Sequence, residues 1–359
     1  MHIIAIEYEP STKRGGQERS YYDILVGLKK KGHSITLAYV KNGDLIDKYK
    51  EHGIAVIQIP SINIFNKLSL REWINFLNSL FLIKNVKGAT IYINQIMDLP
   101  LAAVLKKIKG AKKLVCHLRL PPLSGNLSKK RNQISLLLPC VDQFVVANKN
   151  MFEAHTQMGI PKDKTLIIPN GFSFDFSFPQ KEIAHKKLKL VYLGRMDKGK
   201  GILELIESMP LIIRKWPNTT LSIAGSPMNR DQECYQVNCE EAVKKLSLDN
   251  SVRFVGHQEN PIDFLRNYDI TIFPSTWDEP FGRVLVESIL AGVPVIGRAI
   301  GAVAEILNDS KQQWVFKNNH ELCEIINRIH NYPFEQVSKF QRNNYSISNV
   351  TNNIEKLLS

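Results

Sequence analysis

The sequence STWDEPFGRVLVESILAG, residues 275–292, determines how the second half of the chain is expected to fold. It follows the compact apolar run 270–274, which is typical of a buried strand. Pro280 cannot continue a strand, and residues 283–291 then have the pattern of a helix that Gly292 ends. The stretch therefore predicts a strand, a short loop and the N-terminus of a helix, an arrangement that binds anions.

Two carboxylates bracket the predicted start of this helix. Glu279 lies in the loop, and Glu287 lies eight positions later, within the helix. Because a helix turns by about 100° per residue, Glu287 returns after two turns to a face that can still look toward the loop. We therefore expect a site that binds phosphate through backbone N–H groups and sugar hydroxyls through carboxylates.

The rest of the chain alternates short apolar runs with segments of helix length. In the first half the expected strands are 2–8, 34–39, 54–59, 90–94, 113–117 and 143–147, with a helix over 18–31. In the second half they are 188–192, 220–224, 252–255, 270–273 and 293–296. This alternation predicts βαβ units and parallel sheets. The expected fold is α/β, with two doubly wound domains and residues 172–187 as the linker between them.

Length and composition agree with a globular protein of two domains. The chain has 359 residues, of which 44% are hydrophobic. No basic region followed by a long apolar run opens the sequence, and no uncharged apolar stretch has membrane-spanning length. The five cysteines are scattered and odd in number, so we expect all of them to be reduced. These features predict a protein of the cytoplasm or of the inner membrane surface.

The net charge of +13 comes from the first half of the chain. Residues 1–170 hold 25 Lys and Arg against 12 Asp and Glu, whereas residues 171–359 hold 22 of each. The densest basic tract, residues 101–131, has no acidic residue; it contains Lys106, Lys107, Lys109, Lys112, Lys113, Arg119, Lys129, Lys130 and Arg131. It is either a solvated face or a surface for an anionic membrane or an acidic acceptor. Without a recognition helix or an aromatic-basic motif, no nucleic acid partner is expected.

One predicted helix of the first half has a marked apolar stripe. At helical spacing it carries Leu70, Trp73, Ile74, Leu77 and Phe81, with polar residues on the opposite side. We expect this stripe to pack on the sheet. The alternative is an interfacial helix that inserts Trp73 and Phe81 into a bilayer beside the basic tract.

Three further segments carry residues suited to ligand binding. Gly15 and Gly16 follow the first strand, where open parallel sheets bind ligands, and they form neither a Walker loop nor a G-x-G-x-x-G fingerprint. Arg195 and Lys200 follow the first strand of the second half and could converge on a diphosphate, although a solvated basic turn is the alternative. His117 ends a predicted strand, where it is either structural or able to bond a substrate hydroxyl or move a proton near neutral pH. No histidine has the spacing of a metal ligand, so no metal is expected.

Taken together, these residues resemble the retaining glycosyltransferases of family 4, which have the GT-B fold of two Rossmann-like domains. The matching segments are 15–19 (GGQER), His117, 168–171 (IPNG), 194–201 (GRMDKGKG), 221–225 (LSIAG), 252–256 (VRFVG) and 274–295 with its E-x7-E pattern. Two positions depart from the family. Gly301-Ala302 stands where the family has two glycines, and Ala147-Asn148 stands where it has a helix-capping serine, a task that Asn also performs.

The resemblance implies how the chain is divided and which residues are catalytic. Residues 1–171, with a C-terminal helix of about 341–359 crossing back, would form the acceptor-side domain, and residues 172–340 the nucleotide-sugar domain. Arg195 and Lys200 would neutralise the donor diphosphate as it leaves. Glu279 would bind sugar hydroxyls near the reacting carbon, and His117 would face sugar and acceptor.

Other residues would bind the donor, again by resemblance. N–H groups of residues 281–284 would hold the sugar and a phosphate, Glu287 the ribose, and the turn after Gly256 the nucleobase. The full implied set, besides Arg195 and Lys200, is Gly15, Gly16, His257, Gln258, Phe281, Gly282, Arg283, Val284 and Glu287.

The implied reaction is the retaining transfer of a hexose-type sugar from a UDP- or GDP-sugar to a hydroxyl of a glycan or lipid-linked glycan. Such reactions build cell-surface polysaccharides and glycolipids. The nucleotide sugar is a co-substrate, and no tightly bound cofactor is expected. Two alternatives remain at this point: a GT-B sugar-nucleotide epimerase, which needs no acceptor, and a non-catalytic sugar-nucleotide-binding protein.

Overall fold

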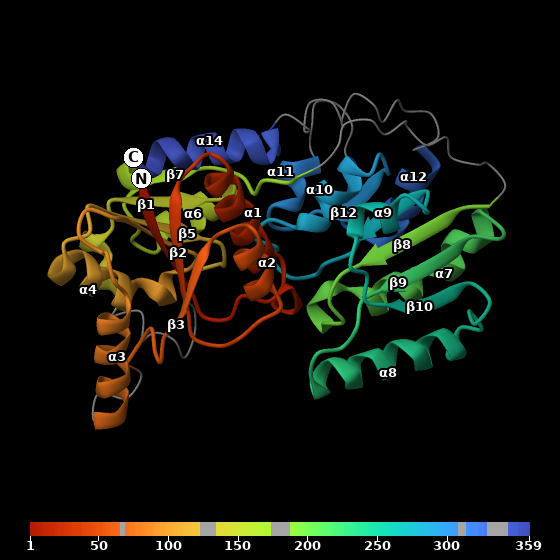
Figure 1. The fold of residues 1–359 in the computed structure, drawn as a ribbon. Helices are drawn as coiled ribbons and strands as arrows, with labels where there is room; N and C mark the ends of the chain where they lie inside the picture. The colour runs from red at the N-terminus through yellow and green to blue at the C-terminus, as the bar shows by residue number, and fades with distance from the viewer. Residues whose placement is uncertain (65–68, 123–133, 174–186, 308–313, 329–343) are drawn as a thin grey trace. The chain divides into compact units, whose positions relative to one another are not determined.

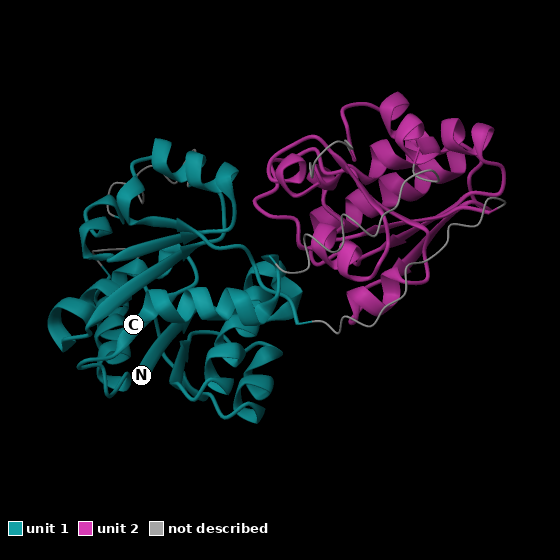
Figure 2. Ribbon diagram, turned by 90° about the horizontal axis from the view of Figure 1, so that it is seen from above, with its two compact units in different colours: residues 1–173, 344–359 teal, residues 174–343 magenta. Residues whose placement is uncertain are grey.

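The computed structural model of the chain describes residues 1–64, 69–122, 134–173, 187–307, 314–328 and 344–359. The chain divides into two compact units, coloured separately in Figure 2. Unit 1 consists of residues 1–173 and 344–359, and unit 2 of residues 174–343. The boundaries expected from the sequence were 171 and 341. Most of the expected linker lies outside the described residues.

Unit 1 is built on a parallel sheet of seven strands in the order β3-β2-β1-β4-β5-β6-β7 (Figure 1). The strands are β1 (His2–Glu7), β2 (Ser34–Tyr39), β3 (Ala55–Gln58), β4 (Thr90–Ile93), β5 (Lys113–Leu118), β6 (Gln143–Val146) and β7 (Thr165–Ile167). Strand β7 is absent from the strands expected from the sequence, because it has only three residues and two of them are exposed. Every pairing between these strands is parallel, so their carboxyl ends meet at one edge.

Helices cover both faces of this sheet. The α-helices are α1 (Gly16–Lys30), α2 (Leu45–Glu51), α3 (Leu70–Leu82), α4 (Leu99–Lys109), α6 (Lys149–Gln157) and α14 (Ile347–Leu358). Short 3-10 helices are η1 (Thr12–Arg14), η2 (Ile96–Asp98), η4 (Leu138–Cys140) and η5 (Lys162–Lys164). Side chains of a strand alternate between the faces. Ile3 and Ala5 of β1 pack in the core with α1 and α14, whereas Ile4 and Ile6 pack in the core with α4.

The C-terminal helix α14 is part of unit 1, as the resemblance implied. Its approach is fixed by a bridge between Phe172 and Ser346. Its Glu355 lies 2.5 Å from the Lys31 ammonium and 2.7 Å from the His33 imidazole, and Val350 and Ile354 are buried in the core.

Unit 2 repeats the design with six parallel strands in the order β10-β9-β8-β11-β12-β13. The strands are β8 (Lys189–Leu193), β9 (Thr220–Ala224), β10 (Val252–Gly256), β11 (Ile270–Phe273), β12 (Val295–Arg298) and β13 (Val315–Phe316). The helices are η6 (Lys198–Lys200), α7 (Ile202–Lys215), α8 (Arg230–Lys245), α9 (Pro261–Leu265), α10 (Arg283–Leu290), α11 (Val303–Leu307) and α12 (Asn319–Arg328). Strand order reverses between β1 and β4 in unit 1 and between β8 and β11 in unit 2. Ligands of such sheets bind at these switch points.

The prediction that the apolar stripe of α3 packs on the sheet is wrong. The exposed fractions are 74% for Leu70, 43% for Trp73, 49% for Ile74, 46% for Leu77 and 78% for Phe81. The helix is instead attached by its narrow opposite side, where Phe76 and Ser79 are buried.

The basic tract is not one continuous surface. Lys106 donates to the carbonyl of Cys140 and the carboxylate of Asp142, and Lys112 donates to the carbonyl of Ser359. Arg119 is buried. Of the remaining members, Lys107 is exposed, Lys109 and Lys113 are partly buried, and Lys129, Lys130 and Arg131 lie outside the described residues.

Candidate functional site

The loops after β8 and β11 meet at the switch point of unit 2. The carbonyl of Gly199 accepts hydrogen bonds from the backbone N–H groups of Thr276 and Trp277, at 2.9 and 3.2 Å. These bonds bring Lys200 to Glu279, with the ammonium nitrogen 2.5 Å from Oε2. The two side chains are only 12% and 14% exposed, so the pair is largely desolvated. The structure thus joins two residues 79 positions apart that the sequence placed in one site.

The backbone of Glu279 is held by the loop that contains Gly301. This glycine has a φ of +56°, and a Cβ atom there would lie 2.7 Å from both the nitrogen and the oxygen of Glu279. The next residue, Ala302, is buried and donates its N–H to the Glu279 carbonyl at 3.1 Å. The close approach therefore requires glycine at position 301, and Ala302 fits where the family has a second glycine.

Two more cations of the site each face a carboxylate. Arg195 Nε lies 3.3 Å from Asp197 Oδ2, and both side chains are partly exposed. Arg283 Nε lies 3.3 Å from Glu287 Oε1, where Glu287 is buried and Arg283 is partly buried. The result is a site of opposite charges arranged in pairs.

Helix α10 begins in the loop of Glu279. Its N-cap is Gly282, which has no side chain to cap the helix, so the first N–H groups of α10 suit an anionic ligand. Phe281 is buried beside it, while Arg283 and Val284 are partly buried in the first turn.

The residues expected near a nucleobase lie after β10, two strands away from β8 in the sheet order. His257 is exposed. Gln258 donates its amide to the carbonyls of Val255 and Gly256. Both residues follow the same edge of the sheet as Lys200 and Glu279, but no hydrogen bond among the described residues joins the two groups.

In unit 1 the first-loop glycines begin helix α1. Gly15 is its N-cap and Gly16 its first residue, two positions earlier than the helix start expected from the sequence. A Cβ atom on Gly15 would meet no atom within 4 Å, so there is open space beside it. Glu18 in the first turn is buried and lies 3.4 Å from Arg14.

His117 lies within β5, which extends one residue further than expected, and is fully buried. Its Nδ1 is 2.8 Å from the hydroxyl of Tyr92, and its Nε2 has no hydrogen-bond partner in the described part of the chain. Burial, with a smaller effect from Arg119, holds the pKa of His117 well below its ordinary value. The imidazole is therefore neutral at neutral pH, which favours a hydrogen-bonding role over the proton transfer that the sequence left open.

A buried polar cluster surrounds Arg119, where the sequence predicted an exposed cation. Arg119 donates from Nε to Asn94 at 2.6 Å and from Nη1 to the side chain of Asn170. Asn94 in turn donates to Glu7 at 3.2 Å. Burial raises the pKa of Glu7 well above its ordinary range and that of nearby Asp98 to about 8.

The other members of this cluster are not among the site residues expected from the sequence. Glu7 ends β1, and Asn94 follows β4 directly. In the sequence, such residues can be found as polar residues at the end of an apolar strand, because ligands bind at the carboxyl ends of parallel strands.

Two family models match this chain, one on each unit. Residues 14–176 match the model "Glycosyltransferase Family 4", and residues 173–346 match "Glycosyl transferases group 1". The chain is a family 4-like glycosyltransferase.

Relatives of this glycosyltransferase include an uncharacterized 42.6 kDa protein in the cps region of Klebsiella pneumoniae. It is 26% identical over 343 residues, covering 85% of this chain and 87% of that protein. The capsular polysaccharide biosynthesis glycosyltransferase CapM of Staphylococcus aureus is 32% identical, but the match spans 39% of this chain and 37% of CapM.

The fold is that of GT-B glycosyltransferases of known structure. The structure of Anabaena HepE in complex with UDP and glucose superposes with a TM-score of 0.79. The identity is 20%, with 100% of this chain and 99% of HepE covered.

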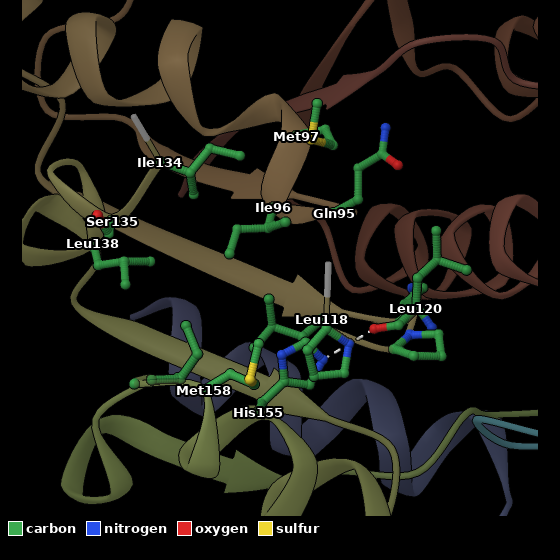
Figure 3. A pocket seen from close by; sticks show the side chains of 15 residues that line it. Gln95, Ile96, Met97, Leu118, Leu120, Ile134, Ser135, Leu138, His155 and Met158 are labelled. Carbon is green, nitrogen blue, oxygen red and sulfur yellow. Dashed lines mark hydrogen bonds between the residues drawn. The ribbon is translucent and has the colours of Figure 1, made fainter. Parts of the chain in front are cut away.

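Unit 1 of the glycosyltransferase also contains an apolar cavity of about 220 Å³ (Figure 3). It lies beside the Arg119 loop, and its walls include Ile96, Leu118 and Met158. His155 donates from Nε2 to the carbonyl of Leu120, at 2.9 Å, across one wall. Among the described residues no three metal-binding side chains gather, either here or in unit 2.

Proposed function

We propose that this glycosyltransferase moves a hexose-type sugar from a UDP- or GDP-sugar to a hydroxyl of a glycan or lipid-linked glycan, with retention at the anomeric carbon. Its role would be the synthesis of a cell-surface polysaccharide or glycolipid. The names of CapM and of the Klebsiella protein in the cps region support a role in the synthesis of a cell-surface polysaccharide. The HepE complex with UDP and glucose supports the donor class.

The observation that carries the proposal is the buried ion pair of Lys200 and Glu279. Without a ligand, each charge compensates the other where water is largely excluded. A nucleotide sugar brings a diphosphate for the cation and hydroxyl donors for the carboxylate. Binding can therefore replace one pair with two new sets of charge-assisted hydrogen bonds.

The leaving diphosphate gains negative charge as the glycosidic bond breaks. Lys200 would stabilise one phosphate, and Arg195, being more exposed, would reach another oxygen. In the proposed front-face reaction, the bond from the anomeric carbon to the phosphate oxygen breaks as the bond to the acceptor oxygen forms. The acceptor proton passes to a phosphate oxygen of the leaving group, so no separate base is required.

The neutral His117 would serve as a hydrogen-bond partner of sugar or acceptor. Its proton is not needed for the reaction, because the phosphate takes the acceptor proton. Burial raises the pKa of its neighbour Tyr92 to about 12, so the hydroxyl that orients the imidazole keeps its proton.

The decisive experiment combines donor screening with product analysis. Thermal shifts against UDP, GDP and a panel of their sugars would first identify the donor, since a ligand of the native state raises stability. Turnover with that donor should then require an acceptor and give a product with the donor's anomeric configuration by NMR. An altered free sugar or sugar nucleotide formed without acceptor would establish the epimerase instead. Binding without any turnover would establish a non-catalytic protein.

A further inference from the structure

Helix α3 carries an exposed apolar stripe that the transfer reaction does not use. Five side chains form it: Leu70, Trp73, Ile74, Leu77 and Phe81. At about 100° per residue they fall within an arc of roughly 100°. Ile108 of helix α4, which contacts α3, is also 76% exposed.

The orientation of α3 is fixed by contacts on its opposite side. Ser79 accepts a hydrogen bond from the N–H of Ser61 at 3.0 Å. Lys109 of α4 donates to the carbonyls of Leu80 and Ile83 at 2.7 and 2.6 Å, which anchors the C-terminal end of the helix. Figure 1 shows α3 at the periphery of unit 1 with α4 as its neighbour. The stripe is therefore held outward by the fold itself.

An exposed apolar surface of this kind marks an interaction site. The occupant could be a bilayer, another protein or a second copy of this chain, and the surrounding charges favour the bilayer. Between residues 54 and 141 the sequence has only two acidic residues, Glu72 and Asp98, and Asp98 is buried. Exposed cations lie at both ends of α3 and beside Ile108; they are Arg71, Lys84, Lys87 and Lys107.

We propose that α3 docks unit 1 on an anionic lipid surface. The helix lies in the plane of the interface, with Trp73, Leu77 and Phe81 among the acyl chains and the flanking lysines at the headgroups. None of the helices in the described ranges is long and apolar enough to cross a membrane, so this attachment would be peripheral. The proposal does not depend on the donor or the reaction.

Vesicle flotation tests the docking directly. The full-length protein is mixed with phosphatidylcholine vesicles that contain about one third phosphatidylglycerol, at low and high salt. The stripe variant carries Trp73→Gln, Leu77→Gln and Phe81→Gln, because Gln keeps helix propensity. The matched control changes exposed apolar residues of unit 2, Leu211→Gln, Met228→Gln and Val237→Gln.

The wild type and the control should float with the anionic vesicles, and the stripe variant should bind at least about tenfold more weakly. Binding should fall in high salt and on vesicles of phosphatidylcholine alone. Equal binding of wild type and stripe variant, or no flotation of the wild type at low salt, would overturn the proposal. An unchanged circular dichroism spectrum and an unchanged thermal unfolding transition of the stripe variant show that it is folded.

Quenching of tryptophan fluorescence by brominated lipids locates the contact. The wild type should be quenched on anionic vesicles, and Trp73→Phe should still float but lose most of that quenching. Sedimentation of the wild type without lipid tests the remaining alternative, in which the stripe binds a second copy of the chain. A dimer that the stripe variant abolishes, together with no flotation, would assign the stripe to a second copy of the chain.

Discussion

The two units contain the same kind of parallel sheet, yet they accommodate polar groups at its carboxyl edge in different ways. Unit 1 holds 26 Lys and Arg against 13 Asp and Glu, whereas unit 2 holds 21 of each. In the site of unit 2, cations and carboxylates face one another as in the pair of Lys200 and Glu279. In unit 1, burial shifts the pKa of Glu7 and Asp98 upward and that of His117 downward, which favours the neutral forms of these groups around the buried cation Arg119.

The difference indicates a division of tasks. A paired charge can exchange its partner for a ligand charge, which suits the binding of a diphosphate. A neutral buried group offers hydrogen bonds without attracting an ion, which suits the hydroxyls of sugars. Substitutions that remove one charge should therefore affect unit 2 strongly and unit 1 weakly.

Glu279→Gln is expected to have the largest effect. It keeps the shape of the side chain but removes the charge that faces Lys200, and kcat should fall by about 10² to 10³-fold. The exposed Glu207 on α7 provides the matched control, and Glu207→Gln should leave kcat unchanged. Steady-state kinetics measure kcat for both variants, and thermal unfolding shows whether they are folded. A Glu279→Gln enzyme with the wild-type kcat would contradict the proposed site.

Gly301→Ala tests whether the backbone contact positions Glu279. The Cβ atom would press on the nitrogen and oxygen of Glu279, so unfolding should become easier by roughly 1–3 kcal/mol, with a fall in kcat. Gly88 provides the control for the cost of the backbone conformation alone, because it has a φ of +74° but no atom within 4 Å of an added Cβ. Gly88→Ala should cost about 1 kcal/mol and leave kcat intact. Equal kcat values for the two variants would remove the positioning role.

Arg195→Ala should weaken the binding of UDP or GDP by about tenfold, since one charge-assisted contact to the diphosphate is lost. Its partner Asp197 is partly exposed, so the fold should tolerate the change. Arg214→Ala, at an exposed position of α7, serves as the control. Calorimetry measures both affinities, and an unchanged dissociation constant for Arg195→Ala would contradict its assignment.

Asp98→Asn should have the smallest effect on activity, together with a pH-dependent effect on stability. The pKa of Asp98 is about 8 in the folded chain, above the value of about 3.9 for an unfolded carboxyl. Between these values the folded chain binds a proton that the unfolded chain has lost, so stability falls as pH rises toward 8.

The Asn variant resembles the protonated acid and should match the wild type near pH 5. Between pH 5 and pH 8.5 its stability relative to the wild type should rise by roughly 4 kcal/mol, which denaturant unfolding at both pH values will measure. A variant destabilised equally at both pH values would show that Asp98 is charged in the folded protein, and the contrast between the units would fail.

The sequence predicted strands well where local pattern decides them. β2, β9 and β11 begin and end at the expected residues, because each is an apolar run bounded by turn or polar residues. β7 and β13 were missed, since strands of three and two residues depend on neighbours that the local pattern does not contain. Asn148 does cap α6, accepting from the N–H of Met151, as its residue type predicted.

The errors have a common physical cause. Periodicity shows which residues share a face of α3 but not which face turns inward, and contacts of Ser79 and Lys109 make that choice. Charge predicted that Arg119 is exposed, but its acceptors Asn94 and Asn170 lie 25 and 51 residues away. In unit 2 the resemblance implied that Lys200 and Glu279 belong to one site, whereas their direct ion pair follows from side-chain positions.

Helix α14 gives the chain an unusual order of assembly during translation. Its residues leave the ribosome after the whole of unit 2, yet they complete the core of unit 1. Until then the surface of α1 that receives α14 is uncovered, including Gly27, where an added Cβ would lie 2.5 Å from the Thr351 hydroxyl. All residues of unit 2 precede α14 in the sequence, so one core of unit 1 is complete only after the whole of unit 2 has been synthesised.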